Sequence, residues 1–482
     1  MFDKDAVYAI HQLMRALTPV EIQRLHSTVR ASSYCLGRQQ YDWLTLTPQE
    51  VELLSGFGAA SVSALGLASF HHNGYVREAA IKKLSQITTG AELPFLIIRL
   101  NDWVSNVRTA AYEAIRPRLV PQYCQAIIDN LQLFNSLEHA QRVDHKQIID
   151  TINNVMQSDE CRPLLLETLN TDDRFLRRAG FRLGLDPAKP DFESLAKRAL
   201  RDHDIVIRSL AAKRISDACD GPACLSFIES MKRDRHMPVR REALRMAVKL
   251  GPPGDLEELR KALLDTHASM REEARYHLRK MAAFDVAAFY RQQLPTAERH
   301  TLYAVVSGLG EFGNAVDDAL IVPYTSHPTP KMRRAALKAL ASLRPDPHME
   351  VFMKALSDEA PRVSSLAVKA LRRKPSSLSA ARLWEILKST PHFHVKRHAF
   401  HLIERCAKWD SIPYLLSALC ETNETLVEMG QSAVSDWVGS FNRSFASPTP
   451  SQIAATRTAL NTCGHLLDET TLERLQFSLK GF

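Results

Sequence analysis

The stretch Met332-Arg333-Arg334-Ala335-Ala336-Leu337-Lys338-Ala339-Leu340 contains the pattern that decides the fold of this chain. An aliphatic residue precedes an arginine, an alanine follows that arginine by three residues, and a second aliphatic residue follows it by seven. These positions are four residues apart, so on an α-helix they lie on one face. The stretch therefore predicts a helix with an apolar face on which a small alanine lets a neighbouring helix approach closely.

The same pattern recurs along the chain at a near-constant spacing. Its basic position, or the residue that replaces the basic one, is found at Arg77, Arg108, Arg177, Arg208, Arg240, Arg271, Arg333, Ser364 and Lys396. Most successive positions are 31 or 32 residues apart, and weaker copies near Lys146 and at Leu302 and Val427 bring the number of units to about twelve. A period of this length predicts two-helix units that stack into an all-α solenoid.

A second feature accompanies the arginine. An aspartate stands six residues before the basic position in many units: Asp102, Asp202, Asp234, Asp265 and Asp358. An acid at this place suits both the turn between two helices and the positive N-terminus of the second helix.

These residues resemble the HEAT-repeat family, in particular its shorter, PBS-lyase-like class, over roughly residues 60–440. The resemblance implies a ladder in which the aspartate and the arginine of successive repeats pair. It also implies interruptions at Leu302, Ser364 and Val427, where the arginine is missing. HEAT resemblance implies a fold and a binding habit, and it does not imply a reaction.

Three regions follow from the extent of the repeat. Residues 1–60 are predicted to form an N-terminal helical cap, with a capping-box pattern from Thr18 to Glu21. The cap begins with an amphipathic stretch whose apolar residues are Val7, Ile10, Leu13, Met14 and Leu17. Residues 61–440 form the solenoid, irregular near 117–150, where the period contains seven extra residues. Residues 441–482 form a linker and a C-terminal helical cap, because a solenoid has to cover its terminal apolar faces.

The composition, 45% hydrophobic and 24% charged, is that of an ordinary folded protein. No stretch approaches the roughly 18 uninterrupted apolar residues of a membrane span, and the N-terminus carries acids where a signal peptide carries bases. We therefore expect a cytoplasmic protein without a membrane partner. The eight scattered cysteines lack a CxxC motif and are expected to be reduced and structural. No cofactor is predicted.

Positions +1, +5 and +8 from the basic position lie outside the apolar arc of the second helix, and the resemblance places that face on the concave surface of a solenoid. These positions form a basic stripe of eleven residues: Arg178, Arg182, Lys213, Arg241, Arg245, Arg279, Arg334, Lys338, Lys369, Arg372 and Arg397. Only Glu272 and Glu404 oppose it, so the stripe carries +9 against +8 for the whole chain. The arginines at the basic position itself are assigned to the aspartate ladder.

Two interpretations of the stripe remain open, a solvated helix face and a binding groove. We expect a non-enzymatic adaptor or scaffold that binds an acidic macromolecular partner, most simply an acidic protein or peptide. The alternative is a nucleic-acid-binding protein, including a repair enzyme that resembles HEAT-like DNA glycosylases, for which Trp103 directly after Asp102 is a weak marker. A phycobilin-lyase-like activity stays open at the level of the family, and the oligomeric state is undetermined.

The densest histidine cluster is a candidate metal site. His394, His398 and His401 are spaced to lie on one helical face, and three imidazoles could hold Zn²⁺. No nearby carboxylate completes the ligand set, so a structural role is preferred. The chain has no His-Glu dipeptide, which disfavours a resemblance to the di-iron deoxyhypusine hydroxylases, and it has no Walker A or GxSxG motif.

Overall fold

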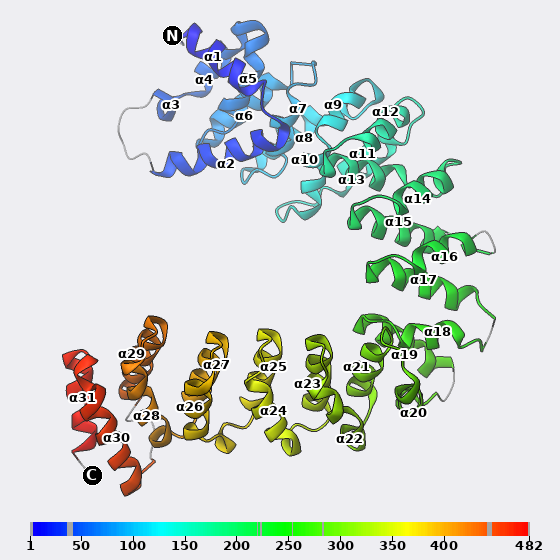
Figure 1. The fold of residues 1–482 in the computed structure, drawn as a ribbon. Helices are drawn as coiled ribbons and strands as arrows, with labels where there is room; N and C mark the ends of the chain where they lie inside the picture. Colours follow the sequence, from blue (N-terminus) through cyan, green and yellow to red (C-terminus); the bar gives the residue numbers. More distant parts are fainter. Residues whose placement is uncertain are drawn as a thin grey trace. The chain divides into compact units, whose positions relative to one another are not determined.

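The computed structural model describes residues 3–35, 42–218, 220–221, 224–252, 254–281, 284–440 and 446–480, and within them the secondary structure is helical with no strand (Figure 1). The prediction of an all-α fold built from helical hairpins is confirmed. The chain divides into two compact units, Met1–Leu250 and Gly251–Phe482, and each is described by itself. The predicted cap boundaries at residues 60 and 440 stay predictions.

The first unit contains seventeen labelled α-helices. Their bounds are α1 Lys4–Met14, α2 Pro19–Cys35, α3 Asp42–Thr45, α4 Pro48–Leu53, α5 Ser61–Ala68, α6 Gly74–Leu84, α7 Leu93–Arg99, α8 Ser105–Ile115, α9 Cys124–Asp129, α10 Leu131–Ser136, α11 Lys146–Met156, α12 Arg162–Glu167, α13 Arg174–Gly184, α14 Phe192–Leu200, α15 Ile205–Ala218, α16 Leu225–Lys232 and α17 Met237–Leu250.

The second unit continues the series. Its bounds are α18 Glu257–Leu263, α19 Ala268–Met281, α20 Val286–Gln293, α21 Leu302–Phe312, α22 Asp318–Ile321, α23 Pro330–Leu343, α24 Met349–Leu356, α25 Pro361–Leu371, α26 Ala380–Ser389, α27 Phe393–Ile403, α28 Lys408–Ser417, α29 Glu424–Gly439, α30 Pro450–Cys463 and α31 Glu469–Leu479. From α18 to α29 the first helix of each hairpin is shorter than the second.

The hairpin of α24 and α25 shows how the repeated pattern specifies a unit. The helix α25 begins at Pro361, where proline loses no hydrogen bond because the first N–H groups of a helix have no intrahelical acceptor. Val363, Ala367 and Leu371, the predicted apolar face, are buried. That face packs on α24 of the same hairpin and on α23 and α27 of the two neighbouring hairpins, which lie side by side in Figure 1.

The N-terminal helices confirm one local prediction and correct another. Thr18 and Glu21 form the predicted capping box, with the backbone N–H of Thr18 donating to Glu21 Oε2 at 2.8 Å. In α1, Val7 and Met14 are buried as expected, whereas Leu13 is exposed. Leu13 is adjacent to Met14, so the helix cannot direct both side chains to the same neighbour.

One apolar segment, Pro48–Ala68, is long enough to cross a membrane by length and mean hydropathy. It is not a continuous helix, because a 3₁₀ segment, Leu54–Ala60, separates α4 from α5 and contains Gly58 at φ 58°. Half of the segment is buried inside the protein. Its apolar residues are therefore accounted for by the core of the first unit.

The residues near 117–150, where the period contains extra residues, form short helices. α9 and α10 are followed by a 3₁₀ turn, Leu137–His139, and then by residues without regular structure before α11. Leu133 and Phe134 of α10 are buried, so this segment packs into the unit and presents its polar residues outward.

Among the described residues, the expectation of reduced cysteines is wrong for Cys420 and Cys463, and also for Cys224, which is disulfide-bonded. Cys420, at the end of a 3₁₀ turn Ala418–Cys420, is joined by a disulfide to Cys463 at the end of α30. The two residues are 43 apart in sequence and meet because α30 packs on α28, which no local motif indicates. Cys124, Cys161 and Cys406 are free and buried. Part of the predicted linker, residues 441–445, lies outside the described residues.

Candidate functional site: a basic hollow in the second unit

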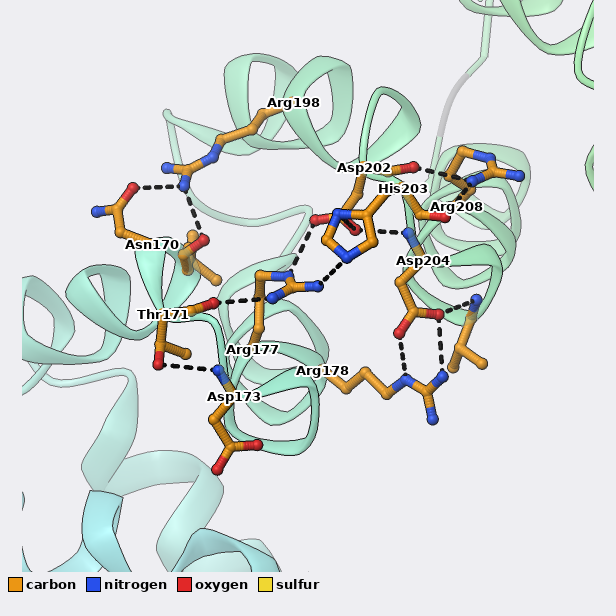
Figure 2. Close-up of polar contacts among 12 residues, drawn as sticks. Asn170, Thr171, Asp173, Arg177, Arg178, Arg198, Asp202, His203, Asp204 and Arg208 are labelled. Atoms are coloured by element: carbon orange, nitrogen blue, oxygen red, sulfur yellow. Dashed lines mark hydrogen bonds and ion pairs between the residues drawn. The ribbon is translucent and has the colours of Figure 1, made fainter.

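The arginine at the basic position joins two consecutive repeats. Figure 2 shows Arg177 of α13, whose Nη1 donates to the carbonyl of Thr171 at 2.8 Å in the turn before its own helix. Its Nε donates to Asp202 Oδ2 at 3.2 Å in the next repeat, and its Nη2 donates to His203 Nε2 at 2.8 Å. One guanidinium thus satisfies turn carbonyls of its own hairpin and a carboxylate of the following one.

The same geometry recurs, which confirms the ladder that the resemblance implies. Its pairs include Arg77 with Asp102, Arg177 with Asp202, Arg208 with Asp234, and Arg333 with Asp358. In each pair the carboxylate also caps the second helix of its own repeat or the turn before it, for example by accepting the N–H of Val104 on Asp102. The arginines at these positions are structural, as expected.

The ladder changes where the sequence departs from the pattern. The repeat at Leu302 supplies no aspartate, and Arg271 binds Glu311 of α21 instead, at 2.8 and 2.5 Å. At Ser364 the arginine is replaced by a hydroxyl, whose Oγ lies 2.7 Å from the carbonyl of Leu356 and 2.8 Å from His398 Nδ1 of the next repeat. Both substitutions keep a polar link between neighbouring hairpins.

In the first unit, carboxylates of the protein itself neutralise most of the predicted basic stripe. Arg178 forms a bidentate ion pair with the buried Asp204, at 2.6 and 3.0 Å (Figure 2), and this pairing lowers the pKa of the Asp204 carboxyl against the opposing effect of burial. Arg182 pairs with Glu138 of the irregular segment. Lys213 pairs with Asp217, and Arg245 pairs with Glu242. Arg241 differs, because its Nε is buried without a hydrogen-bond partner.

In the second unit the stripe is different. Arg334 and Lys338 on α23, Lys369 on α25 and Arg397 on α27 have no ion pair among the residues that the structure describes. Lys338, Lys369 and Arg397 are exposed, and Arg334 is half-buried. Arg279 and Arg372 are exposed too, but they do not line the concavity formed by the others.

These cations surround a hollow of about 640 Å³. Its lining adds Arg362 of α25, so that five cations from three consecutive hairpins face one concavity; we call Arg334, Lys338, Arg362, Lys369 and Arg397 the basic hollow. The lining also includes Arg271, but that charge is already paired with Glu311. Glu311 also lines the hollow, but Arg271 already uses its charge. The five other cations leave a surplus of positive charge, which attracts an anionic group of another molecule.

Sequence reasoning missed Arg362. It stands two residues before the basic position, in the first turn of α25, and only the positions after the basic one were considered. Its separation of seven residues from Lys369 could have revealed it, because residues seven apart lie on the same face of a helix. The side chains of Tyr303 and Leu366 add apolar surface to the same hollow.

Comparison with known families agrees with this geometry. Residues 318–404, from α22 to the end of α27, match HEAT repeats. The chain therefore contains HEAT repeats. All five residues of the basic hollow lie within the matched HEAT repeats, and the hairpins outside the match continue the same period.

Comparison with curated protein sequences gives no match. Similar solved structures include Kap121p bound to Ste12p, at 12% identity with 90% of this chain and 53% of that chain covered and a TM-score of 0.39. Kap95p with RanGDP (12% identity, 96% and 67% covered, TM-score 0.39) and importin beta (12% identity, 89% and 64% covered, TM-score 0.31) are similar too. This chain spans about half the length of Kap121p. Likeness at these TM-scores carries no information about partners.

The predicted histidine cluster has separate polar partners. His394 Nε2 lies 3.1 Å from the carbonyl of Asp358, His398 Nδ1 binds Ser364, and His401 Nδ1 lies 2.8 Å from Glu404 Oε2. Burial lowers the pKa of His398 to about 4, helped by the nearby His394 and Arg397. No group of three metal-ligating side chains occurs in the described ranges of the chain. The cluster therefore serves packing between α25 and α27.

Trp103, the weak marker of a glycosylase-like site, belongs to the first unit and does not line the basic hollow. Its side chain is 58% exposed at the start of the second helix of its hairpin, and Arg30 and Arg142 stack on its ring. The loop tryptophan is thus part of a polar cluster of the first unit.

Proposed function

We propose that this HEAT-repeat protein is a non-enzymatic scaffold that holds an acidic segment of a partner protein in the basic hollow of its second unit. The observation that carries the proposal is the difference between the two halves of the stripe. In the first unit the stripe residues Arg178, Arg182, Lys213 and Arg245 pair with carboxylates of the chain. The five cations of the hollow, in contrast, have no ion pair among the described residues. Like charges gathered in one concavity repel one another and destabilise the fold, and carboxylates of a bound partner would relieve that repulsion.

The shape and lining of the hollow favour a protein segment over a nucleic acid. A phosphate backbone would be tracked by cations repeated along many hairpins, but the cations that share this concavity lie on the three helices α23, α25 and α27. Tyr303, Leu366 and Ser307 give the hollow apolar and hydrogen-bonding surface between the charges. Such a mixture suits a peptide whose acidic side chains alternate with apolar ones. A cytoplasmic location is part of this proposal.

Fluorescence anisotropy with labelled peptides tests the proposal. The probes are a Glu- and Asp-rich peptide with interspersed leucines, the same peptide with Gln and Asn at the acidic positions, and duplex and single-stranded DNA, each titrated at rising salt. We expect the acidic peptide to bind, and its affinity to fall with salt as rim charges are screened. The amide peptide should bind at least about tenfold more weakly, a difference of about 1.4 kcal/mol.

Charge reversal locates the site. Lys338→Glu, or Arg334→Glu with Lys338→Glu, should reduce the affinity for the acidic peptide at least about tenfold. Lys354→Glu is the matched control, because Lys354 is also exposed but belongs to α24, the other helix of a hairpin, and does not line the hollow. Equal losses in Lys338→Glu and Lys354→Glu would contradict the placement. Tight DNA binding with no peptide binding would replace the proposal by the nucleic-acid alternative.

The glycosylase-like alternative has its own assay. It requires release of a base from alkylated DNA, measured by chromatography of the free base. Absence of release at high enzyme concentration would remove it, and release that is lost in Trp103→Ala would instead support an enzyme.

A further inference from the structure

A second cavity is lined by residues of the first unit, whereas the basic hollow belongs to the second. Its volume is about 440 Å³, and it is lined by α2, the end of α7, the turn before α8, and the irregular segment after α10. Arg30, Arg99, Arg142 and Trp103 line it, and we call it the arginine cavity. A volume of this size suits a small ligand.

Arg99 is the most buried charge of this cavity. The residue is 1% exposed, its Nη1 donates to Asp102 Oδ2 at 2.7 Å, and its Nη2 donates to His26 Nε2 at 2.6 Å. Its Nε is buried without a hydrogen-bond acceptor. Burial lowers the pKa of Arg99 to about 10, partly offset by Asp102, so the guanidinium is charged at neutral pH with one N–H group left unsatisfied.

Asp102 cannot neutralise the other arginines, because its oxygens are fully used. Oδ1 accepts from Arg77 Nη2 at 2.7 Å and from the N–H of Val104 at 3.0 Å. Oδ2 accepts from Arg77 Nε at 2.9 Å and from Arg99 Nη1 at 2.7 Å. Asp102 is also the single carboxylate among the residues that line the arginine cavity.

Arg30 and Arg142 approach the cavity from different segments and meet on Trp103. Their guanidinium carbons lie 4.6 and 5.2 Å from the centroid of the tryptophan ring. Arg142 belongs to the irregular segment and also donates to the carbonyl of Asn101 at 3.1 Å. Neither arginine has an ion pair in the part of the chain that the structure describes. The extra residues of this repeat thus bring a further cation to a cluster that is already positive.

We propose that the arginine cavity binds a small phosphate monoester. The guanidinium groups of Arg30 and Arg142 have unused N–H donors that match the paired oxygens of a phosphate dianion, and the buried Arg99 adds a third positive charge beside them. The exposed ring of Trp103 offers a flat apolar surface to the organic part of the ester. Asn101 Oδ1, buried without a donor, would accept a hydrogen bond from a hydroxyl of the same ligand. This site is independent of the function proposed for the second unit.

Isothermal titration of the full chain tests the site with defined probes. The probes are adenosine monophosphate, ribose 5-phosphate, inorganic phosphate, adenosine and a short single-stranded DNA whose phosphates are all diesters. We expect the two monoesters to bind more tightly than inorganic phosphate, and adenosine not to bind. Binding of the diester DNA without binding of the monoesters would overturn the proposal in favour of a nucleic-acid contact.

Substitutions of single arginines test whether the monoester binds in this cavity. Arg30→Gln and Arg142→Gln should each weaken monoester binding at least about fivefold, because each removes one charge-assisted hydrogen bond. The matched control is Arg174→Gln, since Arg174 also stacks on an exposed aromatic ring, Phe175, at 4.6 Å and lines no part of the cavity. Equal affinities in wild type and Arg142→Gln, with melting temperatures unchanged, would overturn the assignment.

The pH dependence distinguishes a phosphate dianion from a permanent anion. The second ionisation of a phosphate ester has a pKa of about 6, so affinity should rise several-fold between pH 5 and 7.5. Burial and the nearby Arg99 and Arg30 lower the pKa of His26 to about 3, against the opposing effect of Asp102, so His26 stays neutral over this range. His139 also lines the cavity, and the series is therefore repeated with His139→Gln. A flat or falling profile in both proteins would contradict dianion binding.

Discussion

At the scale of single residues, the repeated arginine links two consecutive hairpins rather than adding a charge to the surface. Its guanidinium binds turn carbonyls of one hairpin and the carboxylate of the next, as Arg333 does with His327, Pro328 and Asp358. A buried ion pair of this kind adds little net stability compared with apolar residues, but removal of one partner leaves an uncompensated charge. The ladder therefore specifies how hairpins stack.

Asp102 is the strongest test of this role. The side chains of Asp102 and Arg77 are 0% and 3% exposed, and Arg99 depends on the same carboxylate. Asp102→Asn should lower the free energy of unfolding of the first unit by about 3–5 kcal/mol, measured by urea denaturation followed by circular dichroism. Asp217→Asn, which breaks an exposed pair with Lys213, should cost less than about 1 kcal/mol. Similar losses of unfolding free energy in both variants would contradict the role of Asp102 as a buried link between hairpins.

The same residue sets a pH window. Burial opposes ionisation of Asp102, but hydrogen bonds from Arg77 and the charge of Arg99 outweigh it, so the pKa of Asp102 lies below its usual range. A depressed carboxyl pKa means that the stabilisation is complete above the unfolded value of about 3.9 and is lost as the pH falls through the folded pKa. The difference in the free energy of unfolding between wild type and Asp102→Asn, measured by urea denaturation at each pH, should accordingly shrink as the pH falls through this range.

At the scale of helices, small residues determine how closely neighbouring hairpins approach. Gly180 takes the place of the usual alanine because a Cβ there would lie 2.1 Å from Thr168 Oγ1. Gly310 of α21 is more constrained, since a Cβ would lie 2.5 Å from the Cα of Ala339 in α23. The first contact involves a side chain, whereas the second involves backbone that cannot rotate away.

We predict that alanine at these glycines destabilises the protein, although alanine is normally the better helix former. Gly310→Ala should cost about 1–3 kcal/mol by overpacking, and Gly180→Ala should be rescued by Thr168→Ala. Gly439→Ala serves as control, because a Cβ there meets nothing within 4 Å, and it should be neutral or slightly stabilising. Thermal denaturation compares these variants with the wild-type protein. Stabilisation by Gly310→Ala would show that α21 and α23 are not in such close contact.

At the scale of the whole molecule, the chain consists of two compact units, each with its own buried residues. In a repeat protein, stability is nearly a sum of units and of the interfaces between neighbours. Two units of this size can therefore be folded separately.

Fragments 1–250 and 251–482 test this division. Both should be helical by circular dichroism and unfold cooperatively. Fragment 251–482 should bind the acidic peptide within about threefold of the full chain, since all residues of the basic hollow belong to it. An unfolded second fragment would contradict its autonomy, and a folded fragment that fails to bind would move the peptide site elsewhere.

The sequence by itself determined the all-α repeat, the period, and the role of the basic-position arginines, because helical faces and capping turns depend on residues close together in the chain. It also located most cations of the basic hollow. Only the tertiary structure decided which cations are neutralised: Glu138, which pairs with Arg182, belongs to the irregular segment and stands out of phase with the repeat. The arginine cavity, too, combines Arg30, Arg99 and Arg142 from three segments. Ion pairs and cavities depend on which distant residues meet, and a periodic pattern contains no information about the residues that interrupt it.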